Sequence, residues 1–124
     1  MRELGLDTIE KSFNKKIEES NSKIFDGSVR SGNKIEYNGT VIIIGDLNAG
    51  AEVIAQDNVV VLGTIRGLAH AGANGNKEAI IVANAINAPQ IRIADIVLEV
   101  EKKDENEQSI KKRAYIKENE IILE

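Results

Sequence analysis

The spacing of aliphatic residues constrains the fold of this chain more than any other feature of its sequence. From Val29 to Ile65, an aliphatic residue recurs at every sixth position. These residues are Val29, Ile35, Val41, Leu47, Val53, Val59 and Ile65. An α-helix repeats about every 3.6 residues and a β-strand about every two, so neither element alone gives this period. The period is typical of a β-solenoid, in which three strand-and-corner steps complete a triangular coil of about 18 residues.

A longer internal repeat supports this coil length. Residues 41–47 (VIIIGDL) align with residues 59–65 (VVVLGTI), eighteen positions later, and with residues 80–86 (IIVANAI), twenty-one positions after that. The three extra residues fall in the stretch 71–78, whose Asn-Gly pair tolerates the positive φ angles of a tight turn. The sequence therefore predicts an all-β triangular solenoid with a loop at one corner.

The two ends of the chain do not follow the six-residue period. Residues 1–24 are predicted to be a leader or linker, either a short amphipathic helix or a segment without fixed structure. The apolar residues at helical spacing in this segment are Ile9, Phe13 and Ile17. Residues 25–100 are assigned to the β-helix domain. Residues 101–124 are assigned to a charged loop and a carboxy-terminal hairpin, which is a candidate cap for the open end of the solenoid.

Side chains alternate along a strand, so every second residue of the repeats should point away from the interior. If Val41 and Ile43 point inward, the aliphatic residues that alternate with them point outward. The residues predicted to stack on one outer face are Ile42, Ile44, Val60, Leu62 and Ile81. An exposed apolar patch usually marks an interface, and a back-to-back homodimer is the simplest way to cover it. The alternative is that the carboxy-terminal segment folds back over this face.

Composition and charge argue against several classes of function. The formal net charge is −4 and aromatic residues make up 3%, and neither suits a nucleic-acid surface. There is no cysteine for a disulfide or a thiolate metal site, no dense set of carboxylates, and no apolar run that could span a bilayer. The single histidine, His70, has no accompanying residue for nucleophilic catalysis. We therefore expect a cytoplasmic binding module without metal or cofactor, rather than an enzyme.

Three segments resemble the carboxy-terminal domain of the MinC family of septum-site-determining proteins. They are Arg30–Asn33, Gly45–Ala55 and Gly63–Asn76, within a match that runs from about Val29 to Ala94. The resemblance implies a right-handed β-helix that dimerises through one face. It also implies a partner, the membrane-associated ATPase MinD, which recruits the protein to the inner face of the membrane. The family's MinD-binding motif, Arg-Ser-Gly-Gln, falls here on Arg30, Ser31, Gly32 and, in place of glutamine, Asn33.

The same resemblance implies a second partner, the division protein FtsZ. Its contact in the family lies around an Arg-Gly pair, here Arg66 and Gly67, and Leu68 stands where some members have a second arginine. Complete members also have an amino-terminal domain that antagonises FtsZ polymers, and residues 1–24 would be a remnant of that domain and its linker. The leading hypothesis is a dimeric module of a division-site inhibitor that binds MinD and helps to target inhibition of FtsZ assembly.

Two other functions fit a β-solenoid. One is a bactofilin-like structural protein that polymerises into filaments. The other is a hexapeptide-repeat acyltransferase, in which His70 would be the general base. The oligomeric state distinguishes the three hypotheses. A closed dimer indicates the MinD-binding module, an open filament indicates the bactofilin-like protein, and a trimer indicates the acyltransferase.

Overall fold

The computed structural model describes residues 21–100 and 110–124, and these residues form eleven β-strands and no helix. The strands are β1 (Ser22–Asp26), β2 (Lys34–Tyr37), β3 (Thr40–Ile44), β4 (Glu52–Ala55), β5 (Val59–Ile65), β6 (Leu68–Ala71), β7 (Ile81–Ile86), β8 (Gln90–Ile93), β9 (Ile96–Glu99), β10 (Arg113–Lys117) and β11 (Glu120–Leu123). The leader, up to residue 20, and the charged loop at 101–109 lie outside the described residues. Strand β1 already begins at Ser22, three residues before the predicted start of the β-helix domain.

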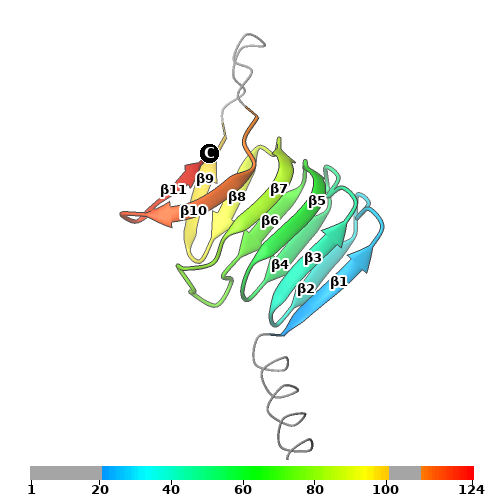
Figure 1. Ribbon diagram of the computed structural model, residues 1–124, viewed down its shortest axis with the longest axis horizontal. Coiled ribbons are helices and arrows are strands. Elements are labelled where there is room, and N and C mark those ends of the chain that lie inside the picture. The colour runs from blue at the N-terminus through cyan, green and yellow to red at the C-terminus, as the bar shows by residue number, and fades with distance from the viewer. Residues whose placement is uncertain (1–20, 101–109) are drawn as a thin grey trace, which may run out of the picture.

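The strands form a β-solenoid with two sheets, as the six-residue period predicts (Figure 1). Sheet A has the order β1-β3-β5-β7-β10-β11, and sheet B has the order β2-β4-β6-β8-β9. The chain alternates between the sheets from β1 to β8, and each strand pairs in parallel with the equivalent strand of the next coil. The third side is short, with the parallel bridges Val29↔Leu47 and Leu47↔Ile65. These bridges confirm the triangular coil of eighteen residues.

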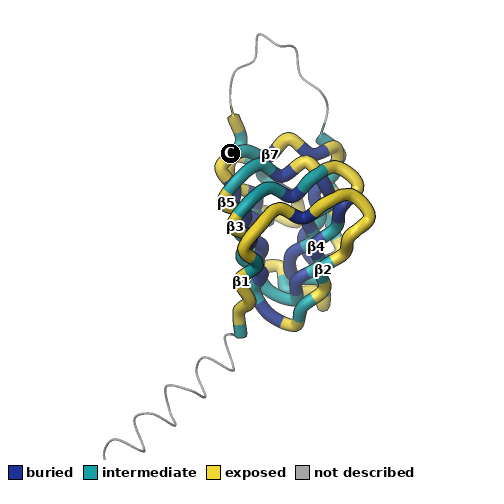
Figure 2. The backbone as a smooth tube through the Cα atoms, turned by 90° about the vertical axis from the view of Figure 1, so that its right-hand side faces the viewer, coloured by how far each residue is buried: buried dark blue, intermediate teal, exposed yellow. Residues whose placement is uncertain are grey.

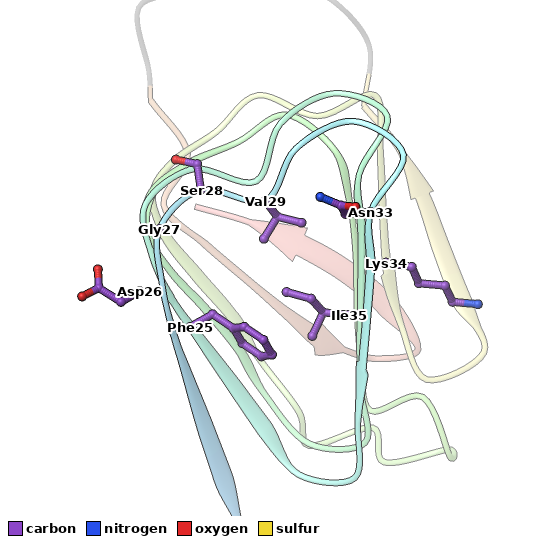
Figure 3. Close-up of a pocket in the computed structure, with 8 residues that line it drawn as sticks. All are labelled: Phe25, Asp26, Gly27, Ser28, Val29, Asn33, Lys34 and Ile35. Atoms are coloured by element: carbon purple, nitrogen blue, oxygen red, sulfur yellow. The ribbon is translucent and has the colours of Figure 1, made fainter.

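The hand of the coil is visible along its axis in Figure 3. The chain rises through Phe25 and Asp26, crosses to Asn33, and descends through Lys34 and Ile35. Later coils lie behind the first one, so the chain turns clockwise as it recedes and the solenoid is right-handed.

The interior is built from aliphatic side chains of successive coils, and Figure 2 shows buried positions recurring along the backbone of each coil. Of the seven residues with six-residue spacing, six are buried, and Ile35, in the first coil, is only half-buried. The buried core contains no aromatic side chain, although Phe25 and Tyr37 pack against it from the first coil. Short aliphatic residues suit an interior enclosed by two sheets because protein cores are close-packed.

The third copy of the repeat has a different register from the one predicted. Val59 pairs with Ile81, twenty-two residues later, and a bulge restores the twenty-one-residue offset at Thr64↔Ala85 and Ile65↔Ile86. A shift of one residue moves every side chain to the opposite face. Ile81 therefore points inward with 0% exposure, and its predicted place on the outer face is wrong. The predicted corner loop is confirmed and lies between β6 and β7.

The carboxy-terminal hairpin caps one edge of the solenoid. Strands β10 and β11 pair antiparallel, with Glu118 and Asn119 at positive φ in the two-residue turn, as a hairpin of this length requires. Strand β10 then pairs antiparallel with β7 and places Ala114 opposite Ile81. The predicted hairpin is confirmed, and it extends sheet A sideways. The alternative, in which the carboxy-terminal segment covers the outer face of sheet A, is not found among the described residues.

Candidate functional site

The outer face of sheet A carries a patch of aliphatic side chains, which we call the apolar face. Four of them stack in register across successive strands: Ile24, Ile42, Val60 and Val82. Two more, Ile44 and Leu62, lie two residues further along β3 and β5 and are 44% and 52% exposed. Water-exposed aliphatic side chains in adjacent rows are the feature expected of an interface.

The structure confirms the outward position of four of the five residues predicted for this face. It replaces Ile81 by Val82, for the register reason given above, and adds Ile24, which is 62% exposed. Sequence analysis missed Ile24 because the predicted boundary assigned it to the leader. The signal was present, since Ile24 lies eighteen residues before Ile42.

Polar and charged groups border the apolar face. On one side, the Thr40 hydroxyl accepts hydrogen bonds from the side-chain amide of Asn58 at 3.4 Å and from the Asn58 backbone N–H at 3.3 Å. The Asn58 side-chain oxygen accepts a further hydrogen bond from the backbone N–H of Ile80 at 2.9 Å. At the hairpin end, Val82 pairs with Arg113, whose guanidinium lies 3.7 Å from a carboxylate oxygen of Glu124. An apolar centre with a polar rim is typical of a protein–protein interface.

The motif residues Arg30, Ser31, Gly32 and Asn33 form an exposed corner between Val29 and β2, which we call the Arg30 corner. Its backbone is fixed: the Gly32 N–H donates to the Gly50 carbonyl at 2.9 Å, and the Asn33 N–H donates to the Arg30 carbonyl at 3.0 Å. Gly32 has a φ of +89° and a Cβ there would meet nothing within 4 Å, so backbone conformation rather than space favours glycine.

The Arg30 side chain is free to bind another molecule. Among the described residues, no carboxylate forms an ion pair with its guanidinium, and the residue is exposed. A guanidinium on a rigid backbone suits bidentate recognition of a carboxylate. The corner thus has the geometry of an anchor for an acidic group on a partner.

The second predicted contact, at Arg66, Gly67 and Leu68, is divided between two surfaces. Arg66 is exposed and lies on the same edge as Arg30, two coils further along, since Val29, Leu47 and Ile65 are bridged in series. Strand spacing puts two coils about 10 Å apart. Gly67 is buried, and a Cβ on it would lie 2.4 Å from the Asn48 carbonyl oxygen. Leu68 belongs to β6 and faces outward from sheet B.

Unlike Arg30, Arg66 forms an ion pair within the chain. Its guanidinium lies 3.7 Å from a carboxylate oxygen of Asp46. The other Asp46 oxygen accepts a hydrogen bond from the Thr64 N–H at 2.8 Å, and the Asp46 N–H donates to the Ser28 hydroxyl at 2.9 Å. This network joins three consecutive corners, so Asp46 both positions Arg66 and holds the edge of the solenoid together.

The only histidine of the chain, His70, contacts the backbone of a neighbouring segment. Nε2 of His70 lies 2.8 Å from the carbonyl oxygen of Ala94, which fixes the ring on the outer face of sheet B. In residues 21–100 and 110–124, no three His, Asp or Glu side chains are grouped so that they could hold a metal ion. The same residues contain no helix long and apolar enough to cross a membrane.

Comparison with known proteins shows which family this chain belongs to. Residues 23–124 match the family model for the septum formation inhibitor MinC, C-terminal domain. The chain belongs to this family. It is 44% identical over 113 residues to a probable septum site-determining protein MinC of Ruminiclostridium cellulolyticum, covering 90% of this chain and 49% of the relative. It is 46% identical over 107 residues to a protein of the same name from Caldanaerobacter subterraneus, covering 86% and 50%.

A solved structure has the same MinC fold. A chain of the MinC:MinD cell division protein complex of Aquifex aeolicus superposes with a TM-score of 0.75 and 33% sequence identity, covering 85% of this chain and 86% of that chain. The present chain spans about half the length of the curated MinC relatives that it matches. The family model covers the apolar face and the Arg30 corner, which lie within residues 23–124.

Proposed function

We propose that this chain is the dimeric, MinD-binding module of a septum-formation inhibitor. Family membership and the similarity to a chain of a MinC:MinD complex support this proposal. The single observation that carries the MinD-binding site is the Arg30 corner, where the family's motif coincides with an exposed arginine that has no partner among the described residues. In this proposal the chain acts by binding: it places the division inhibitor where MinD is, and it catalyses no reaction itself.

The apolar face is the proposed dimer interface. A second copy presents the same aliphatic rows, so a two-fold axis would bury the face against itself. Apolar burial contributes about 25 cal/mol per Å², from which the costs of association must be subtracted. The central position of Ile42 and Val60 in these rows makes them the expected anchors.

The Arg30 corner is the proposed contact for MinD. Arg30 would pair with an acidic group, Ser31 could hydrogen-bond, and Gly32 would let the two backbones approach closely. Asn33 keeps the amide of the family's glutamine on a side chain that is shorter by one methylene. A dimer presents two such corners, and two MinD molecules on one membrane would bind both with a gain in avidity.

FtsZ is the proposed second partner, through Arg66 on the same solenoid edge as Arg30. Because the pair of Arg66 with Asp46 is exposed, its net stabilisation is small and a competing acidic group can displace Asp46. Membrane localisation would be indirect, since it depends on MinD.

Recruitment to lipid vesicles that carry ATP-loaded MinD tests the MinD proposal. The wild-type chain should co-sediment with these vesicles, and Arg30→Glu should abolish co-sedimentation because it opposes an acidic partner. Lys77→Glu is the matched control, with the same change of charge in the exposed loop between β6 and β7. Circular dichroism checks that each variant keeps its β-sheet content. Undiminished recruitment of Arg30→Glu would refute the site, and failure of the folded wild type to bind would refute the function.

A further inference from the structure

The apolar face of sheet A is symmetric about a line between β3 and β5. Its central row crosses four strands in the order Ile24, Ile42, Val60 and Val82. The line divides this row into two equal halves. A rotation that exchanges β3 with β5 and β1 with β7 therefore exchanges Ile42 with Val60 and Ile24 with Val82. Every aliphatic position in the row exchanges with another aliphatic position.

The row toward the carboxy ends of these strands has the same symmetry. Its two middle members, Ile44 and Leu62, are aliphatic and exposed. Its two outer members are polar and also exposed, namely Asp26 on β1 and Asn84 on β7. The same exchange therefore places Ile44 over Leu62 and Asp26 over Asn84, so that each side chain meets one of its own kind.

The row toward the amino ends of the strands is mainly polar. It contains Ser22, Thr40 and Asn58, followed by Ile80 directly before β7. The exchange places Thr40 over Asn58, and both carry hydrogen-bonding groups. Only the pair of Ser22 with Ile80 is mixed, and it lies at the rim of the face, where interfaces are polar and wet.

Two copies that cover this face against each other can be related by a two-fold axis along the strands or along the solenoid. An axis along the solenoid exchanges the two flanking rows, so Ile44 would bury the hydroxyl of Thr40 of the partner subunit. Shifting that axis toward the carboxy ends of the strands would instead place Ile24 over the carboxylate of the partner subunit's Asp26. Polar groups that are desolvated without a partner destabilise a contact. The pattern of the face therefore favours the axis along the strands.

We infer that the chain pairs with a second copy in an antiparallel orientation, with the two-fold axis parallel to the strands of sheet A and between β3 and β5. Ile24 then packs on Val82 of the partner subunit, and Ile42 packs on the partner's Val60. This inference rests on the proposed dimer and adds its orientation, which the proposed function leaves open.

The orientation decides where the two Arg30 corners lie. A rotation about an axis parallel to the strands reverses the order of the coils but keeps the direction of the strands. The Arg30 corner follows the carboxy end of β1, at the side of the solenoid toward which β1 runs (Figure 3). Both corners therefore lie on the same long side of the dimer, where MinD molecules on one membrane can reach them. An axis along the solenoid would place them on opposite sides.

Cross-linking of single-cysteine variants tests the orientation, because the sequence has no cysteine. In the antiparallel dimer, Ile24 lies opposite Val82 of the partner subunit, whereas the two copies of Ile24 are offset by three strand spacings, about 14 Å. Ile24→Cys mixed with Val82→Cys should therefore give a covalent dimer with a short bismaleimide, and either variant alone should give far less. Efficient cross-linking of each variant alone, with no gain in the mixture, would overturn the inference.

A charge exchange tests the same orientation without a cross-linker. Ile24→Lys and Val82→Glu should each weaken the dimer by about tenfold or more, because each places a charge in the interface without a partner. The double variant should regain most of this loss, since each introduced lysine would face the introduced glutamate of the other copy. A double variant that is weaker than both single variants would overturn the inference, because like charges would then meet.

Sedimentation equilibrium of the unmodified chain separates failure of this inference from failure of the proposed function. A wild-type monomer would overturn both, since there would be no dimer to orient. A wild-type dimer in which Ile24→Cys cross-links to its own copy as readily as to Val82→Cys would overturn only the orientation. A wild-type dimer in which only the mixture cross-links efficiently is the expected result.

Discussion

The two sheets of the solenoid have similar inner faces but different outer faces. On sheet A, the central outward row is wholly aliphatic: Ile24, Ile42, Val60 and Val82. On sheet B, the equivalent row is Glu36, Ile54, His70 and Arg92. Both rows sit over a core of Ile, Val, Leu and Ala. The inward pattern sets the coil, and we propose that the outward pattern decides which side associates with other molecules.

The contrast has a simple physical basis. A mixed row with charged groups is well hydrated, so sheet B gains little by being covered. An aliphatic row gains free energy from any contact that removes water. The following experiments test this difference, beginning with the largest expected effect.

The first prediction concerns the division between inside and outside on sheet A. Ile81→Asp places a carboxylate in the closed core and should destabilise the fold by about 4 kcal/mol or more, a large part of a domain's stability. Val82→Asp is the matched variant, and because Val82 points outward it should keep the β-sheet circular dichroism spectrum. Urea denaturation measures both. If Ile81→Asp folds and Val82→Asp does not, then Val82 rather than Ile81 points into the core, and the register described for β7 is wrong.

The second prediction concerns the strength of the apolar face. Ile42→Ala removes a central aliphatic side chain and should weaken the dimer by about 2 kcal/mol, roughly 30-fold in the dissociation constant. Ile54→Ala makes the same change on sheet B and should leave dimerisation unaltered. Dilution series in analytical ultracentrifugation give both constants. If both variants weaken the dimer equally, the outer face of sheet A is no more important for dimerisation than that of sheet B.

The smallest predicted effect is on the polar face. Lys34 and Glu36 form an ion pair at 3.8 Å, with side chains 54% and 63% exposed, and pairs of this kind are worth less than about 1 kcal/mol. Glu36→Gln should therefore change the free energy of unfolding by less than about 0.5 kcal/mol, as read from urea midpoints at low and high salt. A larger, concentration-dependent loss would mean that sheet B also forms an interface.

Much of the fold could be predicted because one aliphatic residue marks each step of its repeat. Each six-residue step needs one aliphatic inward position, and Val41, Val53 and Val59 are all fully buried. The terminal hairpin was also predictable, since Glu118 and Asn119 separate two apolar runs. These features depend on local pattern, which sequence records directly.

The errors arose where geometry depends on a neighbouring coil. The bulge between Val61 and Thr64 shifts the register of β7, and no residue in the repeat itself marks it. The shortened third corner moves Leu68 to sheet B, because Glu52 pairs with Leu68 only sixteen residues later. Ile24 was missed for another reason: the predicted boundary assigned it to the leader, although it lies one coil length, eighteen residues, before Ile42.

Sedimentation equilibrium of the wild type, Ile44→Lys and Ile54→Lys most directly tests whether the apolar face is the interface between two copies. The expected result is a closed dimer for the wild type and for Ile54→Lys, and a folded monomer for Ile44→Lys, because a lysine would be desolvated against its own copy. A dimer that survives Ile44→Lys, or a wild type that grows without limit as a filament, would contradict the account.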